Sequence, residues 1–305
     1  MIYGIIDVGS NTVRLTIYQY ENKELKSLLH KKTMAGLAGY VEKGKMSQKG
    51  IEKACNIVAE YKGILDNFSI TNMYVFATAS LRNIINTDEV VRSIRKSTGV
   101  QVDVISGEEE AVLDYVGATQ ALNITDGLLV DIGGGSTELV SYKNGQIVNA
   151  VSMPIGSLSL FTKHVSKLLP KKSEKEAIVE EIKKELAKIS SDEEESFKEI
   201  CGVGGTIRAA RKLNNDLLEY EEKNSMDCKH LEKLLKLLSS RKKETYRRIL
   251  RVVPDRIHTI IPGMMILNEI ARHFESDVIQ ISNYGVREGY LYSKVLKDGG
   301  HRVKG

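Results

Sequence analysis

The chain has 305 residues, of which 42% are hydrophobic and 28% charged, so it has enough apolar material for two domains with separate cores. Its formal net charge of +4 is mild, it has no tryptophan, and no stripe of basic and aromatic residues suggests base stacking. We therefore expect no nucleic-acid partner. No apolar run approaches the roughly 20 residues that span a bilayer, so we also expect no membrane association.

The N-terminus and the cysteines favour a cytoplasmic location. Met1 to Ile6 reads as a core strand, with no basic region or cleavage site of a signal peptide. Cys55, Cys201 and Cys228 are far apart and form no C-x-x-C pair. An odd set without pairing suits a reducing compartment and argues against a structural zinc site.

Two segments share an order of residues that suits phosphate binding. The apolar run Leu128 to Ile132 contains Asp131 and leads into Gly133, Gly134, Gly135, Ser136, Thr137 and Glu138. At the start of the chain, Asp7 precedes Val8, Gly9, Ser10, Asn11 and Thr12. Residues without side chains let successive N–H groups point into one concavity, as phosphate oxygens require. An acid beside a bound anion implies a cation between them, so Asp7 and Asp131 are candidate metal ligands.

A third glycine turn, Gly204, Gly205 and Thr206, follows the short apolar approach Ile200-Cys201. A single glycine turn would be an ordinary hairpin. The repetition instead predicts a duplicated architecture with a phosphate clamp between the halves.

The first half of the chain alternates strands and helices. A return strand (Val13 to Tyr18) and a third strand (Leu25 to Thr33) follow the first loop, and a helix starts at Ser47 with an apolar face. The strand Met73 to Ala77 leads to Arg82, which we expect to open a helix from Asn83 to Lys96 and to contact an anion. The last elements of this half are a strand from Val100 to Ile105 and a helix from Ala111 to Leu122.

Three acids, Glu108, Glu109 and Glu110, stand where that last helix begins. The helix dipole favours negative charge in the first turn, which explains them in part. The alternative is that one of them projects into a cleft as a general base.

In the second half we expect a strand from Gln146 to Met153 and a charged surface helix from Lys163 to Lys198. Further helices end at about Leu213, Ser239 and Phe274, a strand covers Asp277 to Ile281, and a closing helix ends at Val295. The basic run Arg241 to Arg251 is either a solvated helix face or a track for a polyanion. Strands alternating with helices indicate an α/β fold with mixed sheets and a short hinge near Ala118 to Asp126.

From Ile5 to Leu291 the sequence closely resembles the exopolyphosphatase/guanosine pentaphosphate phosphohydrolase family. The resemblance rests on several segments in the family's order: Asp7 to Thr12, Ala77 to Arg82, Ser106 to Ala111, Asp131 to Glu138, Gly202 to Thr206 and Gly285 to Gly289.

The resemblance implies two actin-like (ribonuclease H-like) domains of the ATPase superfold, with the active site in the cleft between them. We expect residues 1–120 plus 288–305 in domain I and 121–287 in domain II. The family hydrolyses a terminal phosphoanhydride with Mg²⁺ or a similar divalent cation. Its catalytic glutamate matches Glu110, with Glu109 as the fallback. Its phosphate-binding residues match Arg82, Asp131, Gly133, Ser136 and Glu138.

The expected substrate is inorganic polyphosphate of short length, because the chain is short and carries the basic run. We expect no counterpart of the C-terminal helical domain with which the longer exopolyphosphatases hold long polymers. Guanosine pentaphosphate remains the alternative. An actin-fold sugar or acetate kinase and a non-catalytic sensor or filament protein are the more distant ones. His258 stands where the family has an acid two residues after Arg256, and we expect a structural role for it. The oligomeric state stays open, a homodimer being one option.

Overall fold

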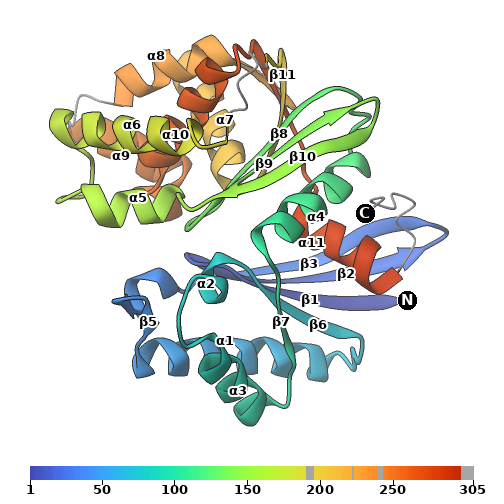
Figure 1. Ribbon diagram of the computed structural model, residues 1–305. Coiled ribbons are helices and arrows are strands. Elements are labelled where there is room, and N and C mark those ends of the chain that lie inside the picture. Colours follow the sequence, from blue (N-terminus) through green and yellow to red (C-terminus); the bar gives the residue numbers. More distant parts are fainter. Residues whose placement is uncertain (190–195, 222, 239–242, 297–305) are drawn as a thin grey trace. The chain divides into compact units, whose positions relative to one another are not determined.

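The computed structural model describes residues 1–189, 196–221, 223–238 and 243–296. The chain divides into two compact units, Met1–Ser106 and Gly107–Gly305, and each unit is described by itself. Figure 1 gives the course of the chain from the N-terminal strand to the last helix. Within the described ranges, no helix combines the length and hydropathy needed to cross a bilayer.

The first unit is built on a five-stranded mixed sheet in the order β3-β2-β1-β6-β7. Its strands are β1 (Ile2–Val8), β2 (Thr12–Glu21), β3 (Glu24–Met34), β6 (Met73–Ala77) and β7 (Val102–Val104). β1 and β2 pair antiparallel, as do β2 and β3, whereas β6 runs parallel to both β1 and β7. Asp7 therefore stands at the carboxyl end of the central strand, which is where α/β sheets commonly bind ligands.

Helices α1 (Gln48–Asn67) and α3 (Thr87–Thr98) pack together against this sheet, as Figure 1 shows. The small elements η1 (Leu37–Tyr40), β4 (Val41–Glu42) and β5 (Lys45–Met46) lie between β3 and α1 in sequence, and α2 (Ala79–Arg82) follows β6. The prediction of one helix from Asn83 to Lys96 is wrong at its start, since Arg82 ends a short helix. The Asn86 side chain bonds both backbone groups of Met46, and this tertiary contact holds the link between α2 and α3 out of a helix.

The second unit repeats the strand order of the first. Its sheet runs β10-β9-β8-β11-β13-β12, with β8 and β9 antiparallel, β9 and β10 antiparallel, and β11 parallel to β8 and β13. The strands are β8 (Gly127–Ile132), β9 (Thr137–Lys143), β10 (Gln146–Met153), β11 (Glu199–Val203), β12 (Ser225–Asp227) and β13 (Val278–Ile281). Apart from β12 at the edge, this is the arrangement of the first unit, so the predicted duplication of mixed sheets is confirmed.

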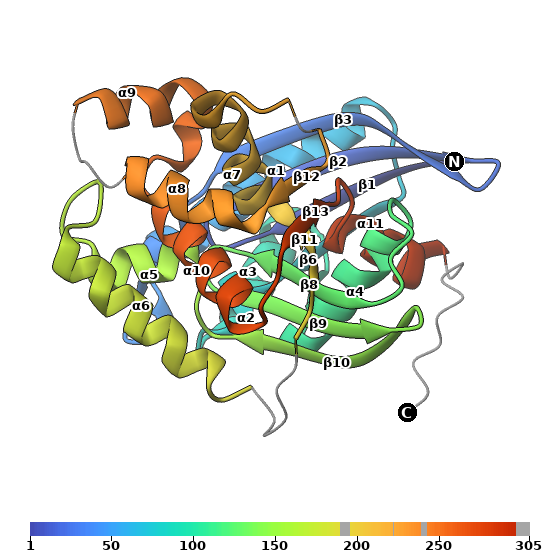
Figure 2. The same cartoon turned by 90° about the horizontal axis from the view of Figure 1, so that it is seen from above.

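The two faces of this second sheet carry different helices (Figures 1 and 2). Leu128, Val130 and Ile132 face a large core with α5 (Ser157–His164), α6 (Lys172–Leu186), α7 (Gly204–Leu218), α8 (Cys228–Leu238), α9 (Lys243–Val252) and α10 (Ile260–His273). Leu129 faces the opposite way, toward Ala111 and Tyr115 of α4 (Gly107–Thr119). This alternation is the period-2 pattern of a strand buried on both faces. The remaining elements are η2 (Pro254–Arg256), α11 (Val286–Tyr290) and η3 (Leu291–Leu296).

Several expected boundaries are wrong. The charged helix covers Lys172–Leu186 rather than Lys163 to Lys198, because Glu174 accepts the Lys171 N–H and caps its start. The segment after Gly156 forms α5, which was not expected as a helix, and β12 was missed. Contacts place α4 and α11 in the second unit. The expected domain limits and the expected hinge stay predictions.

Candidate functional site

The two acid–glycine hairpins close with the same hydrogen bond. In the β1–β2 hairpin the Gly9 N–H donates to the Thr12 carbonyl (3.1 Å), and in the β8–β9 hairpin the Gly133 N–H donates to the Ser136 carbonyl (3.0 Å). Each glycine stands two residues after an acid at a strand end. The sequence match between the hairpins is therefore also a match of backbone geometry.

In the first hairpin, Asp7 is buried and is neutralised by Arg14. The residues face each other across β1 and β2, and Arg14 Nη1 donates to Asp7 Oδ2 at 3.2 Å. Ser10 and Thr12 are buried, and Asn11 is half-buried. The loop is also fixed from outside, since the Asn11 carbonyl accepts the Gly36 N–H and the Ser10 carbonyl accepts the Ala38 N–H.

The turn after β6 packs against this hairpin in the same unit. The Ser80 hydroxyl and the Thr78 N–H both donate to the Val8 carbonyl, one residue past Asp7. Arg82, in the last turn of α2, is half-buried and donates through Nη1 to the Ile105 carbonyl at 3.3 Å. The turn that precedes Arg82 thus bonds the strand that leads into the predicted loop, and Arg82 itself ends α2 instead of opening a helix.

In the second hairpin the position corresponding to Arg14 is an acid. Asp131 lies opposite Glu138 in the β8–β9 register, as Asp7 lies opposite Arg14. Glu138 is buried, and its Oε1 accepts the Ser152 hydroxyl at 2.8 Å. Buried Thr137 donates its hydroxyl to the Ile155 carbonyl (2.8 Å), so this predicted substrate contact is engaged within the protein.

The start of α5 ties down the carbonyls of the glycine loop. The Ser157 N–H and hydroxyl reach the Gly133 carbonyl, and the N–H groups of Leu158 and Ser159 donate to the Gly134 carbonyl at 2.9 Å each. In the described parts of the chain, the N–H groups of Gly134 and Gly135 donate to no backbone carbonyl. The loop therefore keeps N–H groups for an anion, as a phosphate-binding nest does.

The third glycine turn touches Asp131 directly. Gly204 has a positive φ of 81°, and a Cβ there would lie 2.0 Å from Asp131 Oδ1, so only glycine fits at this position. Gly204 and Gly205 begin α7, and the Thr206 hydroxyl donates to the Ile132 carbonyl at 2.8 Å. The predicted turn thus joins the second acid–glycine hairpin, with the helix N-terminus next to a carboxylate.

The three acids at the start of α4 differ in environment. Glu108 is exposed, Glu109 forms an ion pair with Lys294, and Glu110 is buried at 7% exposure. These differences favour Glu110 over Glu109 as the acid that faces the glycine loops. Its role as the base remains a prediction.

Asp114, one helical turn after Glu110, was not singled out from the sequence. It is fully buried, and burial, followed by the charges of Asp131, Glu110 and Glu138, raises its pKa well above the usual range. We call these four residues the acid cluster. The sequence shows that an acid follows Glu110 by four residues, but only the fold shows that this acid is buried.

The second unit holds Glu110, the β8–β9 loop and Gly204 to Thr206, and the first unit holds Asp7, the β1–β2 loop and Arg82. Within the described ranges, no group of three or more acidic, histidine or cysteine side chains is arranged to bind a metal. Mg²⁺ often binds through only one or two carboxylates, together with waters and substrate phosphates. The carboxylates of Asp131 and Glu138, which lie opposite each other, fit that mode.

The remaining candidates lie outside this arrangement. His258 is half-buried and lies edge-on to Phe161, with the ring centroids 5.2 Å apart. Burial, together with the charge of Arg256, lowers the pKa of His258, so the ring packs in its neutral form.

In the basic run, Arg248 and Arg251 form ion pairs with Asp216, which favours the interpretation of this run as a helix face. Arg241 and Lys242 lie outside the described residues.

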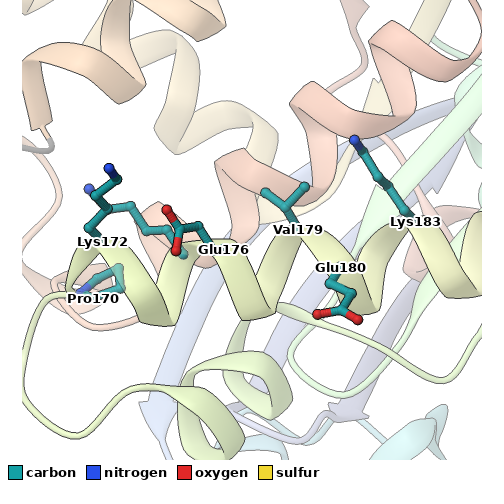
Figure 3. A pocket seen from close by; sticks show the side chains of 7 residues that line it. Pro170, Lys172, Glu176, Val179, Glu180 and Lys183 are labelled. Atoms are coloured by element: carbon teal, nitrogen blue, oxygen red, sulfur yellow. The ribbon is translucent and has the colours of Figure 1, made fainter.

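A hollow of about 660 Å³ lies along α6. Figure 3 shows Lys172 and Glu176 on one side of Val179 along the helix, and Glu180 and Lys183 on the other. None of the predicted site residues lines it. Because its charges are mixed, it offers no clear site for a phosphate chain.

The sequence is similar to a known protein family and to several known proteins. The sequence profile of the Ppx/GppA phosphatase family matches residues 16–298. A bifunctional 3-dehydroquinate synthase/phosphatase of Fusobacterium nucleatum is 29% identical over 91% of this chain, which spans 44% of that protein's length. Exopolyphosphatase 1 of Mycobacterium tuberculosis is 24% identical, with 97% of this chain and 88% of that protein covered.

Solved structures agree with the fold. A crystal structure of the Aquifex aeolicus member of the Ppx/GppA family superposes with a TM-score of 0.80 at 29% identity, covering 99% of both chains. An exopolyphosphatase from Cytophaga hutchinsonii gives a TM-score of 0.86 at 22% identity, with 98% of each chain covered. The two-sheet architecture is therefore that of a known group of structures.

Proposed function

Because the chain belongs to the Ppx/GppA phosphatase family, we propose that it is an exopolyphosphatase, which hydrolyses the terminal phosphoanhydride of inorganic polyphosphate and releases orthophosphate. The observation that carries the proposal is the buried Glu110 in one acid cluster with Asp131 and Glu138, beside a glycine loop with N–H groups to offer. Relatives named exopolyphosphatase support this substrate class.

Binding of the end phosphate needs several donors, since polyphosphate carries about one charge per phosphate. In the second unit these are the N–H groups of Gly134 and Gly135 and the start of α7 at Gly205. The sequence also predicts phosphate contacts in the first unit, from the loop Ser10 to Thr12 and from Arg82. Donors fixed in advance stabilise charge that develops on the phosphoryl oxygens without reorganising during the reaction.

Glu110 takes the role of general base. It orients a water molecule and accepts its proton as the water oxygen attacks the terminal phosphorus in line with the leaving oxygen. Burial at the start of α4 keeps the carboxylate in place. The leaving group is the shortened polyphosphate, so one water is consumed and one orthophosphate is released per cycle.

A magnesium ion would neutralise phosphate charge at this site when bound. Asp131 with Glu138 is the better place for it, because these two carboxylates lie opposite each other in the β8–β9 register. Asp7 already has Arg14 as its counter-ion. We therefore assign Asp131 the main metal-binding role and Asp7 a weaker one.

The test is phosphate release from polyphosphates of defined length and from guanosine pentaphosphate, side by side, with and without Mg²⁺. The proposal predicts release from polyphosphate that stops when the metal is removed. A clear preference for guanosine pentaphosphate would move the chain to the family's other activity. Transfer of phosphate to a sugar, or no turnover of either substrate, would contradict the proposal.

A further inference from the structure

A row of three polar side chains crosses the second sheet close to the glycine loop. Asp131 on β8 lies opposite Glu138 on β9, and Glu138 in turn lies opposite Ser152 on β10. Residues directly opposite each other share one face of a sheet, with Cβ atoms about 4.5–5.5 Å apart. The sequence gave no reason to single out Ser152, and the proposed mechanism leaves it without a task.

This row lies on the face of the sheet that α4 covers. Leu129 and Val140 pack on that face with Tyr115 of α4. Side chains two positions apart on a strand point the same way, so Asp131 lies on the same face as Leu129, and Glu138 on the same face as Val140. The row therefore faces the helix that begins with the three acids.

Ser152 holds the Glu138 carboxylate in place. Its hydroxyl donates to Glu138 Oε1 at 2.8 Å, and Glu138 is buried at 1% exposure. A hydrogen bond to an ionised carboxylate is stronger than one between neutral groups. The bond therefore selects one orientation of the Glu138 carboxylate, with Oε1 directed to β10.

The end of β10 that carries Ser152 is fixed against the glycine loop. The Thr137 hydroxyl donates to the Ile155 carbonyl at 2.8 Å, which ties β9 to the segment that follows β10. A Cβ on Gly156 would lie 2.5 Å from the Gly134 carbonyl carbon, so this segment crosses the loop in direct contact. Ser152 therefore acts on Glu138 from a position that the surrounding backbone holds firmly.

The first unit has a different row at the same register. There Asp7 lies opposite Arg14, and Arg14 lies opposite Lys32. The residue in the middle of that row is a cation that forms an ion pair with Asp7. In the second unit the middle residue is an acid, and the residue on the third strand is a hydroxyl donor to it. The serine thus accompanies the pair of acids.

We propose that Ser152 is a positioning residue for Glu138: its hydroxyl fixes the carboxylate in the orientation that binds a divalent cation together with Asp131. This inference rests on the proposed function, which assigns Mg²⁺ to these two carboxylates. Groups that hydrogen-bond a metal ligand fix its orientation, and losing one typically lowers metal affinity about 10- to 100-fold. Ser152 therefore acts on the affinity for the metal rather than on the chemical step.

The experiment compares Ser152→Val with Ser152→Thr in the full chain, because valine and threonine have nearly the same shape and differ in the hydroxyl. Mn²⁺ prefers the same oxygen ligands as Mg²⁺, and the electron paramagnetic resonance signal of free Mn²⁺ gives its Kd without substrate. Ser152→Val should raise this Kd about tenfold or more. Ser152→Thr should stay within about threefold of the wild type, because it keeps the donor.

Two further variants serve as references in the same titration. Glu138→Gln should lose at least as much Mn²⁺ affinity as Ser152→Val, which shows that the titration reports this site. Ser141→Ala is the control: Ser141 on β9 is buried at 8% exposure, and its hydroxyl has no hydrogen-bond partner among the described residues. It lies an odd number of positions from Glu138 and so on the opposite face of the sheet. It should leave the Kd unchanged.

Wild-type Mn²⁺ affinity in Ser152→Val, or an equal loss in Ser152→Val and Ser152→Thr, would overturn the inference. If Ser152→Val does not fold, Ser152→Ala takes its place under the same criteria, since it removes the hydroxyl without adding volume. An unchanged Kd in Glu138→Gln would overturn the inference together with the metal assignment. The predicted Kd values in a protein that releases no phosphate from polyphosphate would support the inference and refute the proposed function.

Discussion

Asp131 lies directly opposite Glu138 across β8 and β9, at the register position where the first hairpin sets Asp7 opposite Arg14. Two hairpins of the same backbone geometry therefore differ in charge. The first pairs its acid with Arg14, whereas the second sets two acids opposite each other beside the glycine loop, whose Gly134 and Gly135 N–H groups donate to no backbone carbonyl in the described parts of the chain. A divalent cation bound there would offset both the carboxylates and the substrate, so we propose that most of the metal binding falls to the second unit.

The metal assignment predicts that Glu138→Gln weakens the response to magnesium. Removing one of the two facing carboxylates should raise the Mg²⁺ concentration for half-maximal phosphate release about tenfold or more. The measurement is a metal titration of the initial rate at saturating polyphosphate. Glu180→Gln, on the exposed side of α6, is the control and should leave the titration unchanged. An unchanged titration for Glu138→Gln would remove Glu138 from the metal site.

In the first hairpin, Arg14→Met should destabilise the protein by about 1–3 kcal/mol, because it leaves buried Asp7 without its counter-ion. Chemical denaturation measures this change. Arg14→Lys keeps the charge and should recover part of the loss. Equal stability of Arg14→Met and wild type would show that the Asp7–Arg14 pair does not hold the hairpin.

The contact of Gly204 with Asp131 predicts that Gly204→Ala lowers turnover by about a hundredfold, because the new Cβ must displace the Asp131 carboxylate. The positive φ adds strain of about 1 kcal/mol or more. Gly63→Ala in α1 is the matched control, since its Cβ meets no atom within 4 Å. It should raise stability by about 0.5–1 kcal/mol at unchanged activity. Wild-type turnover in Gly204→Ala would separate the third glycine turn from the site.

The cap of α6 predicts a pH-dependent contribution to stability. Hydrogen bonds from Ser166 and the Lys171 N–H lower the pKa of Glu174 to about 2, from 4.5 in the unfolded chain. A lowered folded pKa means that the contribution is fully present above about pH 4.5 and is lost as the pH falls through about 2.

Glu174→Gln should therefore have a lower Tm than the wild type above pH 4.5, and the difference should vanish near pH 2. Thermal unfolding over a pH series measures it, with exposed Glu176→Gln as the control on the same helix. A Tm difference that persists at pH 2 would assign the effect to packing rather than to the charge.

The cysteines should differ in reactivity. Burial raises the pKa of Cys201 and of Cys228 to about 12, so both thiols stay protonated, whereas Cys55 is half-buried. An alkylating reagent at about pH 8 should modify Cys55 first and reach the other two only after unfolding. Peptide mass spectrometry reads the sites, and modification of Cys201 in the native protein would contradict the packing around β11.

Much of the fold could be predicted from the sequence, because an apolar run followed by an acid and a glycine indicates where a strand ends and where a tight turn begins. That reasoning located both hairpins and the Gly204 turn. It erred at Asn83, since the break between α2 and α3 depends on the bonds of Asn86 to distant Met46. Local sequence carries no sign of such a contact.

The residues of the candidate site could also be predicted from the sequence only in part. Sequence placed Glu110 among three acids, and their unequal burial comes from the packing of α4. Asp114 was missed because its enclosure requires α11, which lies far along the chain. The opposition of Asp7 and Arg14 was within reach, since a tight hairpin sets the register of its strands.

We propose that Glu110 prepares the attacking water. The most direct measurement is single-turnover release of phosphate from polyphosphate by Glu110→Gln, with substrate binding measured on the same preparation. We predict unchanged binding and a rate reduced by about 10²–10⁴-fold. A rate near that of the wild type, with Glu109→Gln inactive instead, would contradict it and transfer the role to the neighbouring acid.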